Sequence, residues 1–137
     1  MANHWLEKRA LQCTVAVAAT LPVVAGLWDV VHGLHGGGAW AINHERYLSG
    51  LLMAIGLGFW SGVPDIEART GRFRLLGFVV VIGGLCRLLG VLLGDPVSPS
   101  VAGALVMELG VTPALCLWQA RIAQSPIRRA TLATISP

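Results

Sequence analysis

Two charged residues stand alone inside long apolar stretches of this sequence. Arg87 is the only charge between Leu75 and Gly94, and Glu108 is the only charge between Val97 and Ala120. Charges within a membrane-spanning helix usually face the bundle interior and pair with one another. A guanidinium and a carboxylate can form two parallel hydrogen bonds, which strengthens such a pair. These residue types therefore predict an Arg87–Glu108 contact, in the form of a buried salt bridge.

The helical rise predicts that Arg87 and Glu108 lie at the same depth. Arg87 lies seven residues before Gly94, and Glu108 lies seven residues after Val101. Each is therefore roughly 10 Å from the outer end of its helix at 1.5 Å per residue. The connection DPVSPS between the two runs is short and contains helix-breaking prolines. The two helices should therefore be antiparallel neighbours that bring the two charges together.

Asp29 and Arg46 add one charge from each of the other two apolar runs, so the four charges sum to zero. We expect them to form a charged pocket in the outer half of the protein, with His44, Tyr47 and Trp28 beside it. Such a pocket could bind the polar head of a small amphipathic ligand or lipid, or belong to an accessory subunit of a membrane complex. The alternative is a structural ion-pair network that only holds the helices in register.

Two of these acidic residues are also candidate catalytic groups. Glu108 or Asp29 beside an arginine could act as a general acid or base, which would make the protein a small membrane-embedded isomerase or cyclase. His32, His35 and His44 are candidate ligands for a metal or haem. Solvated or hydrogen-bonded histidines, or a proton relay, are the competing interpretations.

Composition identifies the elements that must position these residues. Hydrophobic residues make up 55% of the 137 residues and charged residues 12%, against about 45–50% and about 25% in soluble domains. The mean hydropathy is +0.69. Four apolar runs cover approximately residues 10–31, 46–63, 74–94 and 101–120, and a span needs roughly 20 residues. Backbone groups in hydrocarbon must bond internally, so the runs are helices.

We therefore predict an all-α protein, a four-helix transmembrane bundle that forms a single integral membrane domain over residues 1–137. The first run is long for the apolar core of a signal peptide, so we expect it to be a retained span. Residues 121–137 should form a basic cytoplasmic tail. The three cysteines lie in the apolar runs without a CxxC pattern, which argues against a disulfide framework or a zinc site.

Basic residues are distributed unevenly among the connections. They precede the first run, separate the second from the third, and follow the fourth, whereas DPVSPS has none. The positive-inside rule then places both termini in the cytoplasm, which predicts a multi-pass membrane protein. The net charge of +3 is therefore a topology signal, and we expect no nucleic-acid partner.

Small residues recur every four positions along the second run, at Gly50, Ala54, Gly58 and Gly62. Small residues at this spacing let membrane helices approach closely. The stripe could pack within the bundle or form the seam of a homo-oligomer. A purely structural oligomer subunit is therefore a further alternative.

The segments HERYLSGLLMAIGLGFW and GRFRLLGFVVVIGGLCRLLGVLLGDPVSPSVAGALVMELGVTPALCLW resemble the bacterial family known as domain of unknown function 4345. Its marks here are Arg46 with Gly50, Arg87 in GGLCRLLG, and Glu108 in MELG ahead of Pro113. The resemblance implies a small four-span protein of the bacterial inner membrane and no established activity.

A second resemblance concerns the end of the first run. GLWDVVHG and His44 are similar to motifs of small four-span isomerases such as styrene oxide isomerase, which bind haem through a histidine near the second span. The sterol-isomerase-like four-span proteins are an analogy of fold only. This resemblance implies haem as a cofactor.

Overall fold

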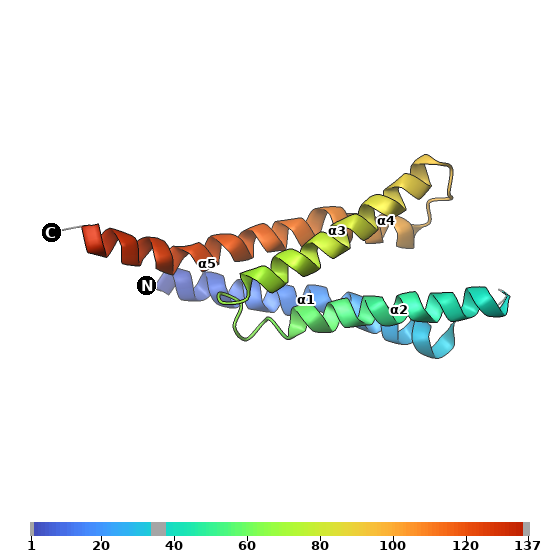
Figure 1. Cartoon of the computed structure of the whole chain (residues 1–137), viewed down its shortest axis with the longest axis horizontal. Coiled ribbons are helices and arrows are strands. Elements are labelled where there is room, and N and C mark those ends of the chain that lie inside the picture. The colour runs from blue at the N-terminus through green and yellow to red at the C-terminus, as the bar shows by residue number, and fades with distance from the viewer. Residues whose placement is uncertain (1, 34–37, 136–137) are drawn as a thin grey trace. The chain divides into compact units, whose positions relative to one another are not determined.

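The computed structural model describes the backbone of residues 2–33 and 38–135, and the side chains of residues 4–33 and 38–124. All regular structure in these residues is helical (Figure 1). Helix α1 covers Ala2–His32, α2 covers Ala39–Trp60 and α3 covers Thr70–Leu92. The next helical stretch consists of α4 (Pro99–Leu105), a π-helix η1 (Val106–Val111) and α5 (Thr112–Ile135). The prediction of an all-α chain is confirmed.

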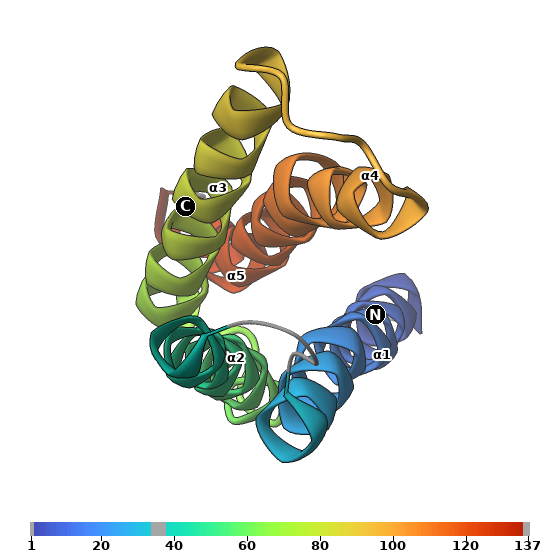
Figure 2. The same cartoon turned by 90° about the vertical axis from the view of Figure 1, so that its right-hand side faces the viewer.

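The chain forms two compact units, and the first contains Met1–Leu11 and Asp65–Pro137. Helix α3 lies alongside the rod made of α4, η1 and α5 (Figures 1 and 2) and packs against all three of its parts. The core of this unit is small and lies near the start of α3. Leu11, Ile66, Phe73 and Ile122 are at most 3% exposed there.

The second unit, Gln12–Pro64, contains the rest of α1 and all of α2. The two helices pack closely through glycine. A Cβ at Gly26 would lie 2.5 Å from the Ser49 carbonyl oxygen, and one at Gly56 would lie 2.6 Å from Cγ2 of Val23. The Trp60 indole Nε1 also donates to the carbonyl oxygen of Ala16 at 2.8 Å.

The first two residues of the predicted small-residue stripe, Gly50 and Ala54, do not lie on the face of α2 that packs on α1, whereas Gly58 is partly buried and Gly62 is buried. A Cβ at Gly50 would meet nothing within 4 Å, and Ala54 is exposed. The packed face instead includes Ser49, Met53 and Gly56. Spacings of four and three residues stay on one side of a 3.6-residue helix, whereas each four-residue step rotates by about 40°. A strict four-residue repeat therefore drifts away from a straight neighbour.

Two helix boundaries differ from the sequence-based prediction. Residues 39–43, expected in the connection between the first two runs, begin α2, because the glycines end at Gly38 and no helix breaker follows. The predicted tail is also helical, since α5 continues from the fourth run to Ile135. The predicted break before α4 is confirmed. The Ser98 hydroxyl accepts a hydrogen bond from the Val101 backbone N–H, and proline occupies the first turn.

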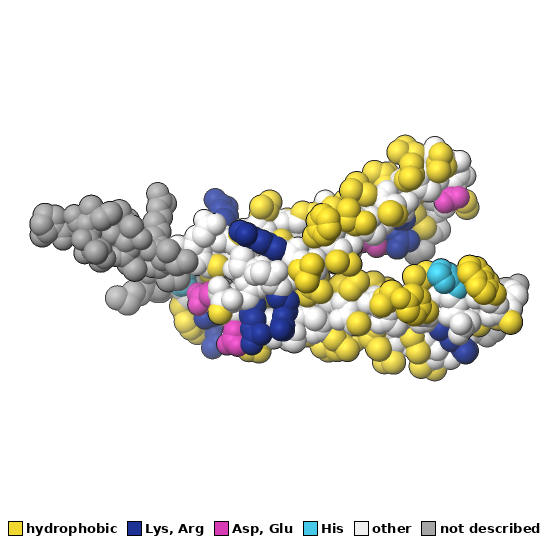
Figure 3. All heavy atoms as spheres, viewed as in Figure 1, with side chains coloured by type: hydrophobic (Ala, Val, Ile, Leu, Met, Phe, Trp, Pro, Cys, Tyr) yellow, Lys and Arg dark blue, Asp and Glu magenta, His cyan; other side chains and the backbone are white. Residues whose placement is uncertain are grey.

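Three helical stretches are long and apolar enough to cross a membrane, namely His4–His32, Thr70–Leu92 and Pro99–Gln124. They indicate a membrane protein. Helix α2 is not among them, and its uncharged part from Tyr47 to Trp60 is about 21 Å long, against about 30 Å for a bilayer core. On the face shown in Figure 3, hydrophobic side chains form extensive patches along the helices, and basic side chains gather around the start of α3.

Candidate functional site

Arg87 of α3 and Glu108 of η1 form a two-point ion pair. Arg87 Nε donates to Glu108 Oε2 at 3.0 Å, and Arg87 Nη2 donates to Glu108 Oε1 at 3.1 Å. Both carboxylate oxygens are therefore engaged by one guanidinium, which is the parallel geometry that suits arginine better than lysine. The predicted contact between these two residues is confirmed.

The prediction that this salt bridge is buried is wrong for the described chain. The Arg87 side chain is 42% exposed and the Glu108 side chain 18% exposed. Within their unit, α3 and η1 supply both partners, and two packed helices cover only one side of a guanidinium. The ion pair is therefore partly open. The Glu108 carboxylate lies closer to the helices, and the Arg87 guanidinium lies closer to the surface.

Gly84 determines how closely α3 approaches the carboxylate. A Cβ at Gly84 would lie 2.9 Å from the Glu108 Cβ and 2.8 Å from Cδ2 of Leu109. Gly84 precedes Arg87 by three residues and so lies on the same face of α3. Its neighbour Gly83 faces open space, since a Cβ there would have nothing within 4 Å. Only the second glycine of GGLCRLLG is therefore required for the close approach.

Glu108 lies inside the π-helix, a local widening that the sequence did not predict. Pro113 has no N–H for the usual bond to the carbonyl four residues before it. The Met107 carbonyl oxygen accepts the Thr112 backbone N–H, five residues on, and also the Thr112 hydroxyl at 2.8 Å. Single π-helical turns occur frequently at functional sites. Glu108 therefore reaches Arg87 from a widened helical turn.

Asp29 and Arg46 belong to the second unit and do not pair there. Gly33 ends α1 with φ +64°, and its N–H donates to the Asp29 carbonyl oxygen at 2.8 Å. A Cβ at Gly33 would lie 3.4 Å from Nε and Nη2 of Arg46. The Arg46 guanidinium therefore lies at the carboxyl end of α1, where the helix dipole favours a cation. Among the described residues no ion pair joins Arg46 to Asp29, so their part in a four-residue site stays a prediction.

The described histidines of the candidate site stack on aromatic residues of their own helices. The rings of Trp28 and His32 are 3.9 Å apart, and His32 Nδ1 lies 3.0 Å from the Trp28 carbonyl oxygen. His44 stacks between Trp40 and Tyr47, at 5.0 and 6.5 Å. His35, the third candidate ligand, lies outside the described residues. Within the described part of the chain no three His, Cys, Asp or Glu side chains are grouped as a metal site would require.

The model of a protein family, Domain of unknown function (DUF4345), matches residues 10–119. The chain belongs to this family. The match includes Arg87, Gly84 and the π-helix with Glu108, so the paired charges lie within the DUF4345 region. No curated protein and no solved structure matches the chain.

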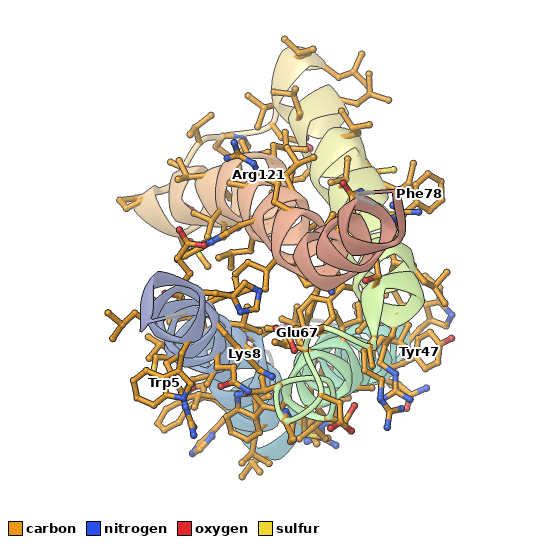
Figure 4. The ribbon with its side chains drawn as sticks, turned by 90° about the vertical axis from the view of Figure 1, so that its left-hand side faces the viewer. Trp5, Lys8, Tyr47, Glu67, Phe78 and Arg121 are labelled. Carbon is orange, nitrogen blue, oxygen red and sulfur yellow. The ribbon has the colours of Figure 1, made fainter. Side chains whose placement is uncertain are left out.

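A second polar cluster at the start of α3 was missed by the sequence analysis. Lys8 Nζ lies 2.8 Å from Glu67 Oε2, and His4 Nε2 lies 3.7 Å from Glu67 Oε1. Figure 4 shows Lys8 and Glu67 pointing toward one another. Glu67 lies within the DUF4345 region, whereas His4 and Lys8 precede it. The charged turn PDIEARTGR, residues 64–72, contains Glu67 and could have drawn attention to this region. Its partner Lys8, however, is 59 residues away in sequence.

Gln119 of α5 forms hydrogen bonds to the connection between α2 and α3 and to the start of α3, close to this second polar cluster. Its side chain is 1% exposed, and its Nε2 donates to the Ile66 carbonyl oxygen and to the Thr70 hydroxyl. A lone amide at the end of the fourth apolar run was the sequence signal for this contact. Because Ile66 and Thr70 flank Glu67, Gln119 anchors the segment that carries the second polar cluster.

Proposed function

We propose that this DUF4345 protein is a small multi-pass protein of the bacterial inner membrane that binds an amphipathic ligand or lipid at the Arg87–Glu108 pair. In this proposal α2 completes a four-span bundle with both termini in the cytoplasm. The uneven distribution of basic residues supports that orientation. Asp29, Arg46 and the aromatic residues near them would then contribute further polar and aromatic groups to the outer half of the protein.

The observation that carries this proposal is the exposure of a paired arginine on an apolar surface. Arg87 is 42% exposed, and the helices that carry the pair are apolar and open elsewhere on their surfaces, where Leu85, Leu89 and Val106 are 48%, 55% and 64% exposed. Pairing with Glu108 neutralises the charge, but the remaining N–H groups still need acceptors in a medium without water. A polar head at the pair, with an apolar tail along α3, would satisfy both requirements.

The geometry favours binding over acid–base catalysis at this site. Both oxygens of Glu108 accept hydrogen bonds from Arg87, so this edge of the carboxylate is occupied by the guanidinium and is closed to a substrate. An isomerase or cyclase would need a carboxyl group that exchanges a proton with its substrate. Glu108 acts here as a partner that holds the guanidinium in place.

The test is to measure which lipids and small molecules co-purify with the protein. Arg87→Leu should abolish ligand co-purification, as detected by mass spectrometry, while the protein still inserts into the membrane. Arg74→Leu makes the same chemical change at an exposed position near the start of α3 and should leave the bound ligand unchanged. Unchanged ligand in Arg87→Leu would refute the proposal. A Soret band in the purified protein would instead favour haem chemistry at the histidines.

A further inference from the structure

The pairing geometry of Arg87 leaves a defined set of donors for a ligand. A guanidinium carries five N–H donors and no acceptor. One on Nε and one on Nη2 point to Glu108, which leaves three, one on Nη2 and two on Nη1. In the described part of the chain Arg87 has no partner other than Glu108. The open edge of the site can therefore only donate hydrogen bonds, so it selects a hydrogen-bond acceptor.

The charge of the site selects among acceptors. Arg87 and Glu108 together are neutral, so an anionic head would leave one uncompensated negative charge in an apolar environment. Isolated charges are very costly there, whereas a neutral carbonyl group that gains hydrogen bonds is not. A cationic head would be unfavourable as well, because the free groups of Arg87 are hydrogen-bond donors and offer it no acceptor. The neutral pair therefore favours a neutral acceptor.

The direction of the Arg87 side chain argues against a simple contact with lipid headgroups. Side chains on a helix lean toward its amino end, and Arg87 lies five residues before the carboxyl end of α3 at Leu92. Arg87 therefore leans away from the nearer helix end, and its fork with Glu108 holds it there. An arginine that reached for a headgroup phosphate would extend toward that end instead.

We infer that the ligand head recognised by the Arg87–Glu108 pair is a neutral carbonyl group, such as that of an ester or a ketone, attached to an apolar chain. This inference rests on the proposed ligand-binding function and specifies the class of ligand. The carbonyl could belong to a bilayer lipid or to a free amphiphile, and the experiment below distinguishes these two sources.

The experiment uses the full chain in nanodiscs of ether-linked phospholipid, which contain no lipid carbonyl groups. Three probes with the same apolar chain are compared at equal mole fraction, namely methyl oleate, methyl oleyl ether and oleyl sulfate. The bound fraction is measured by native mass spectrometry. For the wild type we expect methyl oleate to bind at least about tenfold more tightly than either other probe, a difference of about 1.4 kcal/mol.

Glu108→Gln provides the decisive variant because it removes the negative charge and retains a similar shape. Arg87 then becomes an unpaired cation, so the preference should switch from methyl oleate to the anionic oleyl sulfate. In Arg87→Leu the three probes should bind equally weakly. Glu45→Gln removes a carboxylate from the other unit and should leave the wild-type preference in place.

The possible results separate the two proposals. If no probe binds to the wild type, the ligand-binding function and this inference both fail. If the probes bind without preference, or oleyl sulfate binds most tightly to the wild type, only the carbonyl inference fails. In nanodiscs of ester-linked phospholipid, weaker binding of methyl oleate would identify bilayer lipid as the source of the carbonyl, and equal binding would identify a free amphiphile. Either of these last two results supports the inference.

Discussion

The close approach of α3 to the π-helix makes a quantitative prediction about two adjacent glycines. Gly84→Ala places a Cβ 2.9 Å from the Glu108 Cβ and 2.8 Å from Cδ2 of Leu109. Both distances are below ordinary van der Waals contact, so α3 and η1 must separate or Leu109 must move. Gly83→Ala makes the same chemical change at the preceding residue, where nothing lies within 4 Å of the new methyl group.

The comparison isolates packing because both changes alter helix propensity equally. Replacing glycine by alanine inside a helix stabilises it by about 1 kcal/mol. Overpacking a tight contact costs about 1–3 kcal/mol. We therefore expect Gly84→Ala to be about 1–3 kcal/mol less stable than Gly83→Ala, and Gly83→Ala to be as stable as the wild type or more so.

The assay is reversible unfolding in mixed micelles with increasing sodium dodecyl sulfate, followed by far-ultraviolet circular dichroism. Ligand co-purification is measured on the same samples, since separation of α3 from η1 should also weaken the Arg87–Glu108 fork. Equal free energies of unfolding for the two alanine variants would refute the packing of Gly84 against Glu108 and Leu109.

Three further predictions concern other contacts. Gly56→Ala should be destabilised by about 1–3 kcal/mol relative to Gly50→Ala in the same unfolding assay, because only the first meets side chains of α1, and equal stability would contradict that packing face. Gln119→Leu leaves the buried Ile66 carbonyl without its donor and should lower the free energy of unfolding by about 1–3 kcal/mol; an unchanged value would show that this hydrogen bond contributes nothing. Ala54→Cys lies on the exposed face of α2 and should form disulfide-linked dimers in membranes if this face is a homo-oligomer seam, whereas monomer alone on a non-reducing gel would exclude the seam.

The contact of Arg87 with Glu108 could be predicted from the sequence because two simple quantities determine it. Helical rise sets the depth of each residue, and a short proline-containing connection makes the helices antiparallel neighbours. The scarcity of charge in the apolar runs then leaves few possible partners. The exposure of Arg87 could not be predicted in the same way, because it depends on how many elements surround the pair.

Other features depend on contacts that no local pattern encodes. The π-helix lies between Pro113, which has no backbone donor, and the close contact of Gly84 with Glu108 and Leu109, and these residues lie on different helices. The packing face of α2 follows the 3.6-residue period through Met53 and Gly56 rather than the more conspicuous four-residue repeat. Glu67 meets Lys8 across 59 residues of sequence, and no local pattern around either residue indicates the other as its partner.

The most direct test of the ligand-binding proposal is an experimental density map of the full chain in nanodiscs, resolved well enough to show side chains beside Arg87. The proposal predicts elongated density of an amphiphile with its polar end within about 3 Å of Nη1 of Arg87, while Nε and Nη2 remain on Glu108. Density that shows Arg87 covered by another protein side chain, with no amphiphile beside it, would contradict the proposal.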